Sequence, residues 1–128
     1  DTNNKRMSYG AMVANLDPQK NGGTFYSQVN RHEDGIQLSN HFGTNIVAAI
    51  NKYKEVNNQL PARIIIYRDG VGDGQIDYVY NNEVKDIEAK LDYIYNSDPE
   101  DDQKEYKLMF VIINKKINTR FFRDSRNR

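Results

Sequence analysis

Residues 63–74 read RIIIYRDGVGDG, and this stretch decides the expected fold. The run Arg63–Tyr67 is apolar and β-branched without alternation, which predicts a central strand covered on both faces, as in parallel sheets. The segment Arg68–Gly74 follows as a loop rich in turn-forming residues. Because functional side chains of open α/β sheets gather just past the carboxyl ends of strands, Asp69 stands where such a side chain is expected.

The patterns on either side of this strand predict an alternating arrangement. Apolar runs indicate buried strands near both ends of the chain, the first two joined as an antiparallel hairpin, and residues at helical spacing indicate two helices. The order β-β-α-β-α-β predicts an α/β fold, a mixed sheet flanked by helices. The other expected elements are strands at Ser8–Leu16, Thr24–Asn30 and Leu108–Ile113 and helices at Ser39–Asn57 (with Ser39 or Asn40 as cap) and Gln75–Tyr95.

The length of 128 residues suits a single domain. The 18 basic and 18 acidic side chains cancel to zero net charge, but they are segregated along the chain. Residues 1–68 carry eight basic and five acidic groups, net +3; residues 69–105 carry three and twelve, net −9; residues 106–128 carry seven and one, net +6. Because charges act within a Debye length of about 10 Å, this local division matters more than the total.

Several classes of protein and site are disfavoured by composition. The absence of cysteine excludes disulfides and thiolate metal sites, and the two histidines, His32 and His41, lack metal-like spacing. No apolar run approaches the roughly 18 residues of a membrane span, and no signal-peptide pattern opens the chain. We therefore expect an intracellular protein, in cytoplasm or nucleus, without a membrane or disulfide partner.

Asp69 has the chemistry of a metal ligand. A carboxylate held at a strand end offers oxygens suited to Mg²⁺ or Mn²⁺, which keep most of their waters. The plain alternative is that Asp69-Gly70 is only the turn after a strand. A distant alternative is a calcium loop beginning at Asp69, but Val71 and Tyr80 stand where an EF-hand needs oxygen ligands.

A second candidate feature is the segment 114–122, NKKINTRFF, which follows the last predicted strand. Its basic side chains can neutralise phosphates, and its Asn and Thr side chains can donate hydrogen bonds without base preference. The alternative is a solvated basic tail. The apolar residues interleaved with the charges favour a segment anchored to the domain in one orientation: Ile117, Phe121 and Phe122.

Together these two segments resemble the PIWI domain of Argonaute proteins. The stretch from Pro61 to Gln75, containing YRDGV followed by GQ, resembles the family's signature, and the later NKKINTRFF resembles the Piwi clade in particular. The two motifs stand in the right order, about forty residues apart, and the resemblance covers nearly the whole chain.

The resemblance implies an RNase H-like fold and a metal-dependent endoribonuclease of RNA-mediated, piRNA-type gene silencing. It places the family's second catalytic Asp at Asp69, as a ligand of Mg²⁺ or Mn²⁺. Two metal ions would activate water and stabilise the leaving oxygen in cleavage of target RNA. The basic segment would hold the backbone of a guide small RNA near its 5′ part, through these residues: Lys116, Asn118, Thr119 and Arg120.

Three departures from the family pattern limit this carry-over. The family's loop Glu falls where Gln37 stands, and Gln lacks the negative charge that helps organise a hydrated metal; a shifted loop could instead supply Glu33 or Asp34. The first catalytic Asp and its strand would precede Asp1, and the final ligand would follow Arg128. Residues 1–128 are thus expected to be an internal fragment of one PIWI domain, inactive and poorly stable alone, with exposed strand edges.

The expected partners are the guide RNA, the target RNA and the rest of the Argonaute chain: the upstream strand, the C-terminal part of PIWI, and the MID and PAZ domains. The alternative function is a PIWI module that holds a guide RNA without cutting and silences through partners, which Gln37 favours.

Overall fold

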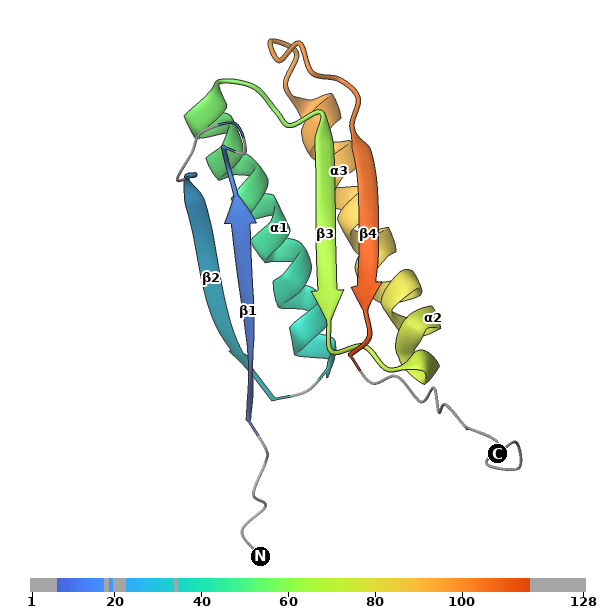
Figure 1. The fold of residues 1–128 in the computed structure, drawn as a ribbon. Helices are drawn as coiled ribbons and strands as arrows, with labels where there is room; N and C mark the ends of the chain where they lie inside the picture. The colour runs from blue at the N-terminus through green and yellow to red at the C-terminus, as the bar shows by residue number, and fades with distance from the viewer. Residues whose placement is uncertain (1–6, 18, 20–22, 34, 116–128) are drawn as a thin grey trace, which may run out of the picture.

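The computed structural model describes residues 7–17, 19, 23–33 and 35–115, with the backbone alone for residues 35–39. The strands lie in one layer and the helices pack behind it (Figure 1). The elements in chain order are β1 (Ser8–Asn15), β2 (Phe25–His32), α1 (Gly35–Asn57), β3 (Arg63–Asp69), a 3-10 turn (Asp73–Gln75), α2 (Ile76–Val79), a π-helical turn (Tyr80–Val84), α3 (Lys85–Ser97) and β4 (Lys107–Ile113).

The four strands form two sheets of two strands each. β1 and β2 are antiparallel with Ser8 opposite His32, whereas β3 and β4 are parallel with Arg63 opposite Lys107. The predicted hairpin and the predicted parallel strand are confirmed. The expected single mixed sheet is not formed by the described residues, because β1 and β3 face each other without a shared ladder of hydrogen bonds (Figure 1).

The core lies between the helices and the inner faces of the strands. Burial of this apolar surface is the main source of stability of the fold. The hydroxyl group of Tyr95 donates a hydrogen bond to the carbonyl of Pro61, which anchors the entry into β3. The buried core cluster consists of Ile46, Ile50, Leu60, Ile64, Ile66, Ile87, Leu91 and Tyr95.

The opposite face of the strands is not covered by any described element. Ile65 and Tyr67 of β3 are 54% and 67% exposed, so the expected burial of this strand on both faces is wrong for the described residues. The reason is that α1 and α3 pack on one face only, which leaves alternate side chains in solvent. The expected burial of the first and last strands fails in the same way, as shown by the exposed side chains of Tyr9, Val13 and Met109.

Helix α1 begins at Gly35, four residues before the predicted start at Ser39. Ser39 suggested a cap, but Ile36, Gln37 and Leu38 are all compatible with helix, so the helix extends over them. Its end is as predicted. Asn58 has a φ of 56°, which Asn tolerates better than most residues, and its N–H donates to the carbonyl of Lys54 at 2.8 Å.

The second helical region is confirmed over about the predicted length, but it is not one regular α-helix. It opens with a tight turn, in which the Gln75 amide donates to the Gly72 carbonyl at 2.9 Å and the Gln75 side chain accepts from the Gly72 amide at 3.2 Å. A π-helical turn then interrupts it at Tyr80–Val84. Such turns carry one extra residue and often mark functional positions.

Candidate active site at the ends of β3 and β4

Asp69 is the last residue of β3, and its carboxylate is half exposed at the strand end. Gly70 follows with a φ of 77°, a conformation that turns the chain away from the strand and that favours glycine. One carboxylate oxygen, Oδ1, accepts a hydrogen bond from the Gly70 amide at 2.9 Å. The predicted position of Asp69 at a carboxyl-terminal strand edge is therefore confirmed.

The parallel register brings the second candidate segment to the same edge. Asp69 lies opposite Ile113, so the residues just after β4 stand beside it. Lys115 places its Nζ 2.5 Å from Oδ2 of Asp69, and Asn114 donates to the carboxylate of Asp73 at 3.0 Å. The ion pair with Lys115, assisted by the Gly70 amide, lowers the pKa of Asp69 below its ordinary value. The two motifs found in the sequence thus meet in space.

The remaining residues of the basic segment cannot be placed. The candidates Lys116, Asn118, Thr119 and Arg120 lie outside the described residues. Lys115, their immediate neighbour, shows that the segment starts beside Asp69.

Gln37, which the family resemblance predicts to stand at the position of the loop Glu, lies in the first turn of α1. The structure gives its backbone only, so it does not test the predicted role of the side chain. Glu33 precedes the helix directly after β2, and Asp34 lies outside the described residues.

Arg68 and Glu83 form a partly buried ion pair that the sequence patterns did not predict. Nε and Nη2 of Arg68 reach the two carboxylate oxygens of Glu83 at 2.9 and 3.1 Å, so the contact is bidentate. The Glu83 side chain is only 2% exposed. The sequence did contain a signal for the burial of Glu83. This residue stands four positions after Val79 and four before Ile87, on the apolar stripe of the helix.

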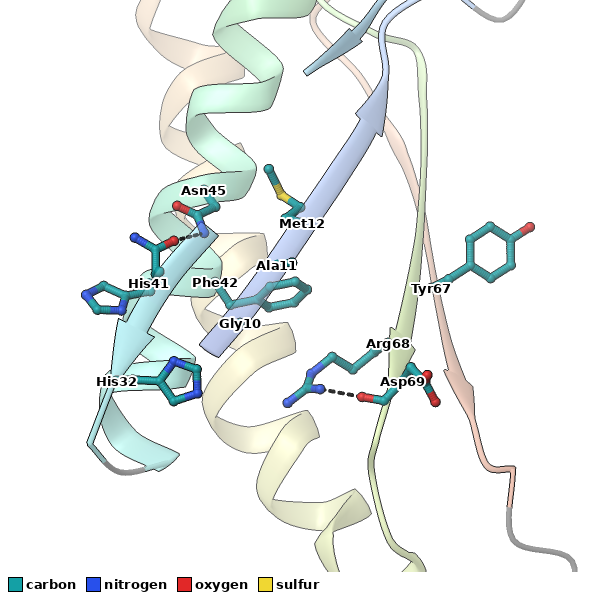
Figure 2. Close-up of a pocket in the computed structure, with 11 residues that line it drawn as sticks. Gly10, Ala11, Met12, His32, His41, Phe42, Asn45, Tyr67, Arg68 and Asp69 are labelled. Carbon is teal, nitrogen blue, oxygen red and sulfur yellow. Dashed lines mark hydrogen bonds between the residues drawn. The ribbon is translucent and has the colours of Figure 1, made fainter. Parts of the chain in front are cut away.

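A cavity of about 180 Å³ lies between β1 and the end of β3 (Figure 2). His32, which is 4% exposed, and His41 both line it, and neither Nδ1 atom has a hydrogen-bond partner within the described part of the chain. Buried polar atoms without partners are costly. The cavity therefore suits water or a polar group as its occupant. Its lining comes from β1, β2, α1 and β3: Gly10, Ala11, Met12, Asn30, His32, His41, Phe42, Asn45, Tyr67, Arg68 and Asp69.

The donor chemistry at this edge suits a divalent cation only in part. Mg²⁺ commonly binds through one or two carboxylates together with waters and phosphate oxygens, and Asp69 supplies one accessible carboxylate. Among residues 7–17, 19, 23–33 and 35–115, no cluster of three or more His, Cys, Asp or Glu side chains is present. The calcium-loop alternative does not fit, because Asp73 and Asp77 lie in helical turns rather than in an open loop.

The fold and this edge define a class of protein: an α/β domain in which a carboxylate at one strand end adjoins Lys115, just after the neighbouring strand, where open α/β sheets carry their functional side chains. The family model of the Piwi domain matches residues 1–128, and the chain belongs to that family. The resemblance stated from the two motifs is confirmed.

Piwi-clade proteins are among its similar relatives. The chain is 51% identical to Piwi-like protein Siwi of Bombyx mori over 122 residues, which is 95% of this chain and 13% of that protein. It is 43% identical to protein aubergine of Drosophila melanogaster over 124 residues (97% of this chain, 14% of that protein) and 33% identical to protein piwi of the same species over 126 residues (98% and 14%). The chain thus spans about one seventh of these relatives' length.

In the part of the chain that the structure describes, no helix is both long enough and apolar enough to cross a membrane.

Proposed function

We propose that this chain is the central portion of the Piwi domain of a small-RNA-guided silencing protein, and that Asp69 serves there as a metal ligand in the cleavage of target RNA. The observation that carries the proposal is the meeting of the two strand ends. An accessible carboxylate of β3 lies beside the start of the basic segment that follows β4. A strand-end acid next to phosphate-binding cations is the arrangement that phosphodiester chemistry needs.

Asp69, Lys115 and the basic segment would have separate roles in this function. The Asp69 carboxylate would hold Mg²⁺ or Mn²⁺, and the cation when bound would supply an activated water and neutralise charge at the leaving oxygen. Lys115 now pairs with Asp69 and is well exposed, so it can turn toward a phosphate when Asp69 binds a cation. The basic residues beyond it would hold the guide backbone without reading its bases, which leaves recognition of the target to pairing with the guide. The proposed contacts are Lys116, Asn118, Thr119 and Arg120.

The parent protein would complete the fold. Within the described residues, β1 pairs only with β2 and β3 only with β4, so each has an open edge toward the other. Open edges bind further strands readily. These edges, the cavity between them and the apolar outer face support an incomplete RNase H-like sheet, in which an upstream strand of the parent lies between β1 and β3. The MID and PAZ domains of an Argonaute chain would complete the RNA-binding protein.

The decisive experiment is single-turnover cleavage by the guide-loaded parent protein carrying Asp69→Asn. Asn keeps the size of the side chain but removes the charge, so the cleavage rate should fall at least about 100-fold while binding of guide and target RNA is retained. Asp77→Asn, an exposed position in α2, is the matched control and should cleave like the unaltered protein. Unchanged cleavage with Asp69→Asn contradicts the proposed role.

The second candidate function is a guide-binding Piwi module that silences without cutting. It is favoured by Gln37, a neutral amide at the position of the family's loop Glu. If this candidate is correct, the unaltered parent cleaves poorly and Gln37→Glu raises the rate. Efficient cleavage by the unaltered protein excludes it.

A further inference from the structure

The guanidinium group of Arg68 is held from three directions at the end of β3. Nε and Nη2 donate to the two oxygens of the Glu83 carboxylate. Nη1 donates to the backbone carbonyl of Asp69 at 2.5 Å (Figure 2). Its Cζ lies 5.7 Å from the centre of the Phe42 ring, in the range of a cation–π contact. Each of the three guanidinium nitrogens thus has its own acceptor.

The partners of Arg68 come from separate elements and are themselves well anchored. Glu83 lies in the π-helical turn between α2 and α3, and its side chain is buried. Phe42 lies on α1, and its ring meets Phe110 of β4 edge-on at a centroid distance of 6.3 Å. Because these elements belong to the packed core, the arginine links the end of β3 to a rigid frame.

Stability alone does not account for such a pair. Two buried charges lose hydration, and replacing a buried ion pair with apolar residues of similar size often leaves a protein equally or more stable. The pair instead fixes an orientation. The guanidinium group, held by Glu83, donates to the carbonyl of Asp69 and so orients the peptide group between Asp69 and Gly70. The same peptide carries the Gly70 amide, which donates to Oδ1 of the half-exposed Asp69 carboxylate at 2.9 Å, so its orientation affects where the carboxylate points.

We infer that Arg68, locked by Glu83, is a positioning residue that holds the carboxylate of Asp69 in the direction required for binding a divalent cation. The inference rests on the proposed function of Asp69. Neither Arg68 nor Glu83 touches the substrate in this role, and their effect passes through the backbone of Asp69.

The test replaces both charges together in the guide-loaded parent protein. Arg68→Met with Glu83→Met removes the fork without leaving a buried charge unpaired. The matched control carries Arg63→Met and Glu88→Met, two exposed positions on the same strand and on the adjoining helix. Mn²⁺ binding is measured by electron paramagnetic resonance of the free ion, alongside target-RNA affinity and single-turnover cleavage.

The double variant Arg68→Met with Glu83→Met, here called the core double variant, should bind target RNA like the unaltered protein. Its dissociation constant for Mn²⁺ should rise at least about threefold, and its cleavage rate should fall about 10- to 100-fold, as a displaced catalytic group predicts. The control should change neither quantity. Unaltered Mn²⁺ affinity in the core double variant overturns the inference.

A second variant separates a loss of positioning from a loss of folding. Arg68→Lys keeps a positive charge beside Glu83 but cannot reach both the carboxylate and the Asp69 carbonyl, so it should also weaken Mn²⁺ binding while the melting temperature stays close to that of the unaltered protein. Unaltered Mn²⁺ affinity in Arg68→Lys likewise overturns the inference. Absence of cleavage by the unaltered protein instead counts against the proposed function, and the Mn²⁺ titrations then still decide the role of Arg68.

Discussion

The β1–β2 hairpin and the β3–β4 pair are of similar size but are held in the fold in different ways. The parallel pair lies against α1 and α3, and Ile64 and Ile66 of β3 belong to the buried core. The hairpin rests mainly on α1, and its nearest core contact is the partly buried Met12. The parallel pair is thus the half that is packed more deeply into the core, and it carries Asp69, Lys115 and the arginine that links β3 to the helices.

The largest effect should come from the core beneath the parallel pair. Leu91 is fully buried in α3, so Leu91→Ala should lower the free energy of unfolding of the parent Piwi domain by about 2–5 kcal/mol. Met12→Ala in the hairpin removes a similar volume from a partly buried site and should cost about 1 kcal/mol. Urea denaturation measures both. Equal losses would remove the distinction between the two halves.

A smaller effect should come from the anchor at the start of β3. Tyr95→Phe removes the hydroxyl that binds the Pro61 carbonyl and leaves that acceptor buried, which should cost about 1–2 kcal/mol. Tyr93→Phe on the same helix is the matched control, because the Tyr93 side chain is exposed and its loss of a hydroxyl should be nearly neutral. Thermal unfolding of the two variants compares them, and a neutral Tyr95→Phe would show that the anchor is dispensable.

The smallest effect should depend on pH, at the other end of the parallel pair. Burial alone would raise the pKa of Asp101, but hydrogen bonds from the Gln103 amide, Lys54 and the Leu60 amide outweigh it and hold the pKa below its ordinary value. Lys54 and the Glu100 amide likewise lower the pKa of Asp98. Near the ordinary pKa of an aspartate, the unfolded chain therefore binds more protons at Asp98 and Asp101 than the folded chain does. The contribution of these two groups to the free energy of unfolding should be constant above about pH 5 and should fall as the pH drops below about 4.

In Asp101→Asn, the melting temperature should fall less on acidification than it does in the unaltered protein. The neighbouring and exposed Asp102 provides the control, since Asp102→Asn should leave the pH profile of the melting temperature unchanged. A profile that is the same in all three proteins would show that the Lys54 cluster does not contribute.

The sequence predicted the parts of this molecule that depend on local pattern. The apolar runs before Asp69 and before Asn114 predicted two strands and placed a functional segment after each, but that the two strands are neighbours comes from the structure alone. The predicted burial of β3 on both faces is wrong, because an Ile-rich run indicates that a strand can be buried and does not indicate which elements cover it. Ile65 and Tyr67 are exposed on the face that no described helix covers.

The arginine link could not be predicted from the strand pattern for a different reason. The turn-forming residues from Arg68 onward predict a loop there, yet β3 continues through Asp69. Glu83 is on the apolar side of its helix, but its pairing with Arg68 depends on the π-helical turn, and nothing in the local sequence specifies such a turn. The family's loop position at Gln37 and the basic residues from Lys116 onward remain predictions.

The parallel pairing of β3 and β4 has a consequence for the order in which the chain folds. Arg63 pairs with Lys107, forty-four positions later, whereas the hairpin closes between Asn15 and Phe25, ten positions apart. Closing a longer loop costs more entropy, and contacts distant in sequence form slowly. During synthesis the hairpin and α1 are complete while β3 still lacks its partner strand. The edge that carries Asp69 is therefore assembled after the hairpin, once α3 and β4 have been made.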